Sequence, residues 1–186
     1  MEDIRYCALI LSRYDRLRLL HVPSNLVSVI RECVNKQWYL QLLKQKEYHG
    51  TTELKLGGCP WWADGNDAVE ARYFISSLVG NLKSHGWEVC GTIDLSRHNN
   101  DKSTFLLKQC RPSFAPHMCV SFNKANRIRL IVSRYIFLQF FFVRYNFMAL
   151  IIEFKSQYQR SLEEKHDTKY MDSKTSIVLL ATMFCT

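Results

Sequence analysis

The chain has 186 residues, which is enough for one domain of ordinary size or for one domain with an extension. Hydrophobic residues make up 47% of the chain, and this composition excludes a wholly disordered protein. The formal net charge is +8, but no dense run of Lys or Arg occurs, which weakens an assignment to nucleic acid or to acidic membranes without removing it.

The cysteines and the N-terminus indicate the compartment. Seven cysteines are scattered singly along the chain, and their number is odd. The segment Met1-Glu2-Asp3 is acidic, whereas secretory signal peptides begin with basic residues. These features predict reduced thiols and an intracellular protein, cytoplasmic or nuclear.

The first part of the chain combines strand and helix patterns. Residues 4–11 are apolar but too few to span a bilayer. Residues 16–22 alternate polar and apolar side chains and predict a strand. A break and a cap at 23–25 precede a helical stripe that predicts a helix to about residue 36. We interpret residues 38–43 as an extension of this helix.

The centre of the chain specifies structure most clearly. Residues 52–56 alternate as a half-buried strand does, and the Gly-Gly-Cys-Pro segment at 57–60 ends it. Apolar residues at helical spacing then predict a helix over 67–85. Gly86 is a natural residue to end this helix, because glycine adopts the left-handed conformation at low cost. Residues 87–94 alternate again and predict a strand.

The next segments predict two hairpins. A strand over 103–109 closes a hairpin with the preceding one, and residues 117–122 and 127–131 form a second hairpin. The element order is β-α-β-α-β-β-β-β. This order predicts an α+β fold with two helices on one face of a mainly antiparallel sheet, followed by an irregular or helical C-terminal extension. We place the domain at residues 14–131.

One internal echo suggests a repeat. Residues 15–20 and 126–131 match in residue type at every position, and they lie about one small domain apart along the chain. We therefore hypothesise that residue 126 opens a truncated second copy of the module. No cap or amphipathic helix follows residue 131, so the copy stops there.

Two interpretations of the extension at 132–186 are open. The first is a membrane helix over 135–152, although Arg144 in mid-span would cost about 2.5–3.5 kcal/mol. The second is that the extension is translated intron, since Val132-Ser133 is what a splice donor encodes in frame and T-rich introns translate into Phe, Leu, Ile and Tyr. We favour the second, which genomic and transcript sequence across codon 132 would decide.

The central block also carries a recognisable pattern of residues. Its members are Glu53, Lys55, Leu56, Gly58, Pro60, Trp61, Trp62, Ala63, Gly65, Ala68, Val69, Ala71 and Arg72, then Gly86, Trp87, Asp94, Ser96, Arg97, Asp101, Lys102 and Ser103. This pattern resembles that of a group of uncharacterised eukaryotic proteins that often carry the module in tandem copies. The resemblance covers about residues 14–131 and implies no activity, cofactor or partner.

Two places are candidates for an interaction surface. Trp61 and Trp62 stand beside a turn, where indoles either close the end of a core or form an aromatic binding surface. The loop over 94–102 is the most polar in the chain, and it is either a solvated connection or a site. Its candidate side chains are those of Asp94, Arg97, Asp101 and Lys102.

Catalytic, cofactor and metal motifs are weak or missing in the sequence. Cys110, His117 and Cys119 have ligand chemistry, but the close Cys or His pair typical of zinc sites is missing. Neither a P-loop nor a dinucleotide fingerprint occurs, and no cysteine or serine stands in a nucleophile signature. We therefore predict no catalytic residue, no metal and no cofactor, and lean against an enzyme.

Elimination then favours one class of function over two others. We predict a non-enzymatic protein-interaction module whose partner is an unknown protein. The first alternative is a nucleic-acid-binding module in which the arginines at 16, 18, 127 and 129 line one sheet face, provided that their strands are neighbours. The second alternative is a protein anchored in a membrane through residues 135–152.

Overall fold

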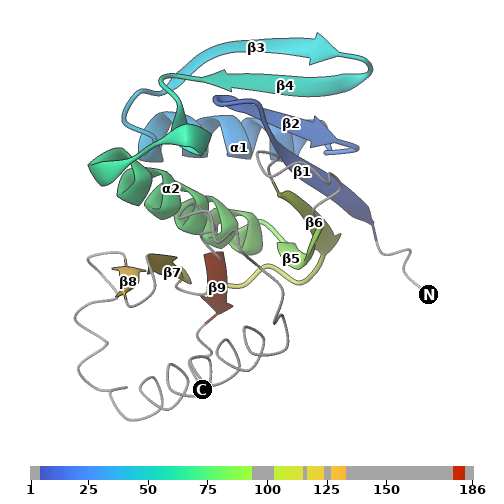
Figure 1. Cartoon of the computed structure of the whole chain (residues 1–186). Helices are drawn as coiled ribbons and strands as arrows, with labels where there is room; N and C mark the ends of the chain where they lie inside the picture. Colours follow the sequence, from blue (N-terminus) through green and yellow to red (C-terminus); the bar gives the residue numbers. More distant parts are fainter. Residues whose placement is uncertain (1–4, 94–102, 115–116, 124–126, 133–177, 183–186) are drawn as a thin grey trace, which may run out of the picture.

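The computed structural model describes residues 5–93, 103–114, 117–123, 127–132 and 178–182, which form two helices and two antiparallel sheets (Figure 1). The larger sheet contains β1 (Tyr6–Ser12), β2 (Arg16–Leu20), β3 (Leu42–Tyr48), β4 (Thr51–Leu56), β5 (Trp87–Ile93) and β6 (Thr104–Gln109). The helices are α1 (Ser24–Gln37) and α2 (Gly65–Ser84), with the short 3-10 helix η1 (Pro60–Trp62) between β4 and α2. The smaller sheet contains β7 (His117–Asn123), β8 (Arg127–Val132) and β9 (Val178–Thr182).

The larger sheet has the strand order β3-β4-β2-β1-β6-β5, and every neighbouring pair in it is antiparallel. Both helices lie on one face of this sheet (Figure 1). The predicted α+β fold class, with two helices and a mainly antiparallel sheet, is therefore confirmed. The predicted hairpin of β5 and β6 is also present.

The core lies between the larger sheet and the two helices. Alternation in β2 and β4 turns Leu17 and Leu54 toward the helices, and each is fully buried. Ile30 of α1 and Phe74 of α2 meet them and are also fully buried. Removing this apolar surface from water is the main force that holds the helices on the sheet, at about 25 cal/mol per Å².

Strand β1 shows why residues 6–11 form a continuous apolar run. The strand lies in the interior of the sheet, paired with β2 and β6, and Cys7, Ala8 and Leu9 are all buried although they alternate between its two faces. A strand buried on both faces loses the polar alternation by which a half-buried strand is recognised. β1 precedes residue 14, so the sheet extends further toward the N-terminus than the predicted domain.

The prediction that α1 continues over residues 38–43 is wrong. The helix ends at Gln37, and Trp38 already has an extended backbone, with its indole buried and its Nε1 donating to the Gly57 carbonyl at 2.9 Å. Gln41 has a left-handed φ of 55°, which turns the chain into β3. Tertiary burial of a single aromatic side chain therefore overrides a helical spacing of apolar residues.

Helix α2 confirms the predicted central helix with small shifts at its ends. It begins at Gly65, two residues earlier than predicted, and the Asp64 side chain caps it by accepting from the Gly65 N–H at 2.7 Å. It ends at Ser84. Gly86 then has the expected left-handed backbone, with φ of 82°, and its N–H donates to the Lys83 carbonyl at 3.1 Å.

The two strands that carry the paired arginines, β2 and β8, belong to different sheets. The predicted hairpin of β7 and β8 is present, but it pairs with β9 and contacts α2 rather than joining the larger sheet. Figure 1 shows α2 between the two sheets. β2 and β8 consequently belong to different sheets, so the arginines at 16, 18, 127 and 129 do not line one face as the nucleic-acid alternative required. The truncated repeat stays a prediction.

Most of the extension lies outside the described residues. Residues 133–177, including the candidate span at 135–152, fall there, while β9 pairs with β7 near the end of the chain. Within the described ranges, no helix is both long enough and apolar enough to cross a membrane. The translated-intron interpretation stays a prediction.

Gly57 marks a close approach that a methyl group would block. A Cβ built there lies 2.3 Å from the Leu40 carbonyl oxygen, so a backbone segment would have to move. We expect Gly57→Ala to lower the free energy of unfolding by about 2 kcal/mol, measured by urea denaturation. Gly91→Ala is the matched control, because its nearest atom lies at 3.9 Å and the change should stay below about 1 kcal/mol. Equal effects of the two substitutions would contradict the steric explanation.

Candidate functional site: a cationic pocket on the open sheet face

The face of the larger sheet opposite the helices carries charged side chains on β2, β3 and β4. In β2, Arg16 and Arg18 alternate with the buried leucines and therefore lie on this open face. The register places Arg18 beside Glu53 of β4, and Glu53 beside Lys46 of β3. Strands β2 and β3 thus bring cations to one carboxylate on β4.

The carboxylate of Glu53 is fully buried by these cations. Arg18 Nε donates to Oε2 at 2.8 Å, Lys46 Nζ lies 3.3 Å from Oε1, and Arg16 donates to Oε1 from a nitrogen of its guanidinium group. Burial alone would raise the pKa of Glu53. The hydrogen bonds from Arg18, Arg16 and Lys46 outweigh burial and lower this pKa to about 2. Glu53 is therefore ionised at every physiological pH.

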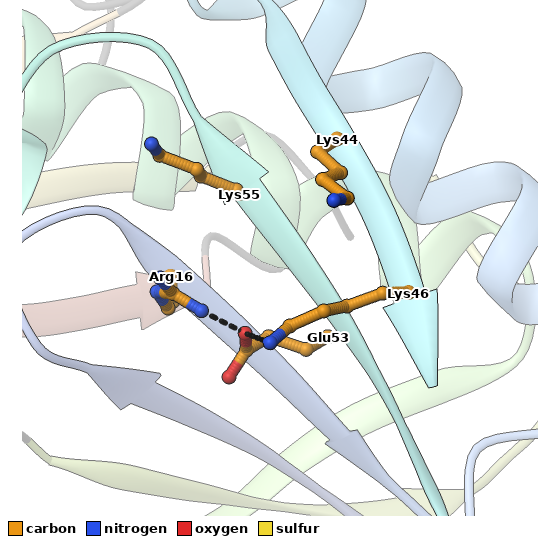
Figure 2. Close-up of a pocket in the computed structure, with 5 residues that line it drawn as sticks. All are labelled: Arg16, Lys44, Lys46, Glu53 and Lys55. Carbon is orange, nitrogen blue, oxygen red and sulfur yellow. Dashed lines mark hydrogen bonds and ion pairs between the residues drawn. The ribbon is translucent and has the colours of Figure 1, made fainter. Parts of the chain in front are cut away.

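A pocket of about 210 Å³ opens beside this carboxylate, and its lining is strongly cationic. Figure 2 shows Arg16 and Lys46 joined to Glu53. Lys44 on β3 and Lys55 on β4 are not joined to it. Lys55 Nζ lies 3.8 Å from Asp15 Oδ2, at the edge of ion-pair range. The Lys44 ammonium group has no ion-pair or hydrogen-bond partner among the described residues. The lining residues are Arg16, Lys44, Lys46, Glu53 and Lys55.

The pocket lining therefore contains more positive than negative charge. Its residues carry four positive charges and one negative charge, a net of +3. The two charged neighbours, Arg18 and Asp15, cancel each other. Like charges gathered on a sheet face repel one another, and this arrangement favours binding of an anion.

One aromatic ring lies at the border of the pocket. The Arg18 guanidinium carbon is 4.2 Å from the centroid of the Tyr48 ring, and Lys46 Nζ is 5.2 Å from the same centroid. Both cations are within the range of cation–π attraction, so Tyr48 helps to hold them beside Glu53. The ring is already engaged by cations of the chain itself.

The two tryptophans that were predicted to form an interaction surface differ in their environment. Trp61 is part of the core closure: its ring stacks on Phe74 with centroids 6.3 Å apart, and its Nε1 donates to the Arg16 carbonyl at 2.9 Å. Trp62 is 44% exposed and packs edge-on against Tyr14, which is also exposed. The second indole is the more exposed of the two, and the role of either in an interaction surface stays a prediction.

The other predicted site residues lie outside the described part of the chain. They are Asp94, Arg97, Asp101 and Lys102. The residues of the cationic pocket, in contrast, were missed as a site by reasoning from the sequence. The sequence does place two lysines at every second position, at 44 and 46, which puts both on one face of a strand. Because residues 38–43 were assigned to a helix, β3 was not predicted as a strand, and this shared face was not recognised.

The buried cysteines are poor nucleophiles. Burial raises the pKa of Cys7, Cys33 and Cys119 to about 11 in each case, so their thiols stay protonated at neutral pH. In the described ranges, no three His, Cys, Asp or Glu side chains gather as metal ligands would.

Fold and site together define a small α+β domain with a cationic pocket on the open face of its sheet. The chain belongs to a family of uncharacterised domains, whose family model matches residues 5–108. The match runs from β1 to β6 and so contains the larger sheet, both helices and every residue of the pocket. No curated protein and no solved structure matches the chain.

Proposed function

We propose that the chain is a non-enzymatic protein-interaction module that binds an acidic, extended segment of a partner protein. The observation that supports this most is the position of the cationic pocket beside an edge strand. β3 is the last strand of the larger sheet, and two lysines of the pocket, Lys44 and Lys46, stand on it. Edge pairing and charge recognition are thereby available at one place.

The edge of β3 provides the backbone half of the recognition. Residues 43–47 of this strand are exposed, and no described strand pairs with its outer side. The outward N–H and C=O groups of an edge strand form hydrogen bonds with an added strand, as in β-augmentation. Side chains of the added strand that point to the open face would stand next to Lys44 and Lys46.

Charge selects the kind of partner. Pairing of β3 with the same strand of a second copy would bring Lys44 and Lys46 close to identical lysines, which is unfavourable. Acidic side chains on the added strand instead compensate the excess positive charge of the pocket. The partner is therefore a different protein with an acidic segment.

A peptide fits the face better than single-stranded nucleic acid does. Proteins that bind single strands offer aromatic faces on which bases stack, at about 1–3 kcal/mol per base. At the pocket, the Tyr48 ring is engaged by Arg18 and Lys46. Such a ring has little surface left for a base, whereas the edge of β3 offers an extended peptide its full backbone.

The test uses a labelled heptapeptide that alternates threonine and glutamate, titrated into the full chain. We expect saturable binding that weakens about tenfold in the double variant Lys44→Gln/Lys55→Gln, because the two lysines of the pocket that do not pair with Glu53 lose their charge. Backbone amide shifts in the NMR spectrum should concentrate on β3. Lys108→Gln on β6 is the matched control, since it removes a lysine from the same sheet outside the pocket.

Three outcomes would contradict the proposal. One is equal affinity of the double variant and the Lys108→Gln control. Another is binding without amide shifts on β3. The third is tighter binding of a ten-nucleotide oligo-dT that displaces the peptide, which would assign the face to nucleic acid.

A further inference from the structure

We infer that the pocket formed by Arg16, Lys44, Lys46 and Lys55 binds a phosphate group, so that the module reads a phosphorylated residue in its acidic partner segment. This inference rests on the proposed function, since it identifies the anion that the edge-bound segment would carry. The charge, the donors and the size of the pocket all fit a phosphate group.

The net positive charge of the pocket is larger than the single negative charge of a carboxylate. The lining carries a net charge of +3 when Glu53 is counted as ionised. One Glu or Asp side chain of a partner brings a single negative charge, whereas a phosphomonoester brings about −1.5 to −2 at pH 7. Phosphate therefore compensates the excess more completely than a carboxylate does.

Glu53 is already counted in this net charge, and both of its carboxylate oxygens are already bound to cations of the chain. Both carboxylate oxygens accept from, or pair with, Arg16, Arg18 and Lys46. Glu53 thereby holds Arg16 and Lys46 in the lining of the pocket, where their remaining N–H groups are preorganised. Glu53 is thus a positioning residue, and the cations around it contact the ligand.

The donor set suits phosphate. Lys44 and Lys55 are long, flexible point charges, and each ammonium group has three donors. Among the described residues Lys44 Nζ pairs with no carboxylate, and Lys55 Nζ lies 3.8 Å from Asp15 Oδ2, so both keep donors for a ligand. Arg16 adds a planar guanidinium group, which matches the geometry of phosphate oxygens. A phosphate presents three acceptor oxygens to such a set, whereas a carboxylate presents two.

The size and position of the pocket also fit. A volume of about 210 Å³ corresponds to about seven water molecules at ~30 Å³ each, so a phosphate group enters together with several waters. Neighbouring strands lie about 4.8 Å apart, so a phosphorylated side chain on a strand added beside β3 has only to pass Lys44 to reach Lys55 on β4.

The experiment compares three heptapeptides that differ only at the central position, which is threonine, glutamate or phosphothreonine. For the full chain at pH 7.4, we expect the phosphothreonine peptide to bind at least tenfold more tightly than the glutamate peptide. The advantage should disappear in Lys44→Gln/Lys55→Gln and persist in Lys108→Gln. It should also shrink at pH 5, because the second pKa of a phosphomonoester is about 6.

The outcomes separate this inference from the proposed function. Equal affinity of the glutamate and phosphothreonine peptides, with both weakened in the double variant, overturns the phosphate inference and leaves the acidic-peptide module standing. Inorganic phosphate that displaces the peptide at equal concentration, with no shift of the β3 amides, supports the phosphate pocket and overturns the edge-pairing module. Loss of the phosphothreonine advantage in Lys108→Gln overturns the assignment of phosphate to the pocket.

Discussion

Replacing Glu53 with glutamine is expected to lower the free energy of unfolding by about 3 kcal/mol at pH 7. The substitution keeps the shape of the side chain and removes the one charge that Arg16, Arg18 and Lys46 share. Those cations then repel one another on the sheet face without compensation. The estimate follows from the fall in pKa from 4.5 to about 2 in the folded protein, where the side chain is fully buried.

The same carboxylate makes stability depend on pH in a defined window. Because the folded-state pKa is depressed, the stabilisation by Glu53 is fully present above its unfolded pKa of about 4.5 and is lost as pH falls through about 2. Wild-type stability should therefore decrease between pH 4.5 and pH 2. Glu53→Gln should remove the part of this slope that belongs to residue 53, as measured by urea denaturation across that range.

The matched control is Glu32→Gln on α1. Glu32 pairs with Lys36 at 3.4 Å, and both side chains are exposed, so the loss of this pair should cost no more than about 0.5 kcal/mol. If Glu53→Gln and Glu32→Gln unfold at the same urea concentration, Glu53 is not the charge that holds the cationic face together.

Truncating Trp38 to alanine is expected to destabilise the domain by about 3–5 kcal/mol, the largest effect of any single substitution proposed for this protein. The indole is 2% exposed and contacts the rings of Phe74 and Tyr39, with centroids 6.0 Å and 4.9 Å away. Its Nε1 also donates to the Gly57 carbonyl. Alanine would leave a cavity where α1, α2 and the end of β4 meet, and would leave that carbonyl without its donor.

Trp62→Ala provides the comparison for the same chemical change on the surface. Trp62 is 44% exposed and packs edge-on against the ring of Tyr14, so its truncation should cost at most about 1.5 kcal/mol. Thermal and urea unfolding of both variants measure the difference. Two tryptophan variants of equal stability would show that Trp38 is not part of the core.

Local patterns in the sequence determined much of the fold. Alternation in β2 and β4, and the helical stripe of α2 between its cap and Gly86, are set by neighbours within a few residues along the chain. These elements were predicted almost to the residue, because each buries one face and exposes the other. The α+β class followed from their order.

Elements without such a pattern were decided by tertiary structure. β1 is buried on both faces, so its sequence is uniformly apolar, and β3 is exposed along most of its length, so its sequence is largely polar. Neither shows the alternation that marks a strand. Pairing with β6, which is distant in sequence, places β1 inside the sheet, and the hairpin with β4 makes β3 a strand. The buried indole of Trp38 stops the helix that local propensity would extend.

The cationic pocket depends on tertiary structure in the same way. The sequence determines that arginines alternate with leucines in β2 and that two lysines flank Gln45 in β3, and so that cations are present in excess. Their convergence on Glu53 requires residues that lie 35 and 37 positions apart in the chain to become neighbours. Strand order and register determine which charges meet, and neither is encoded in any one short segment.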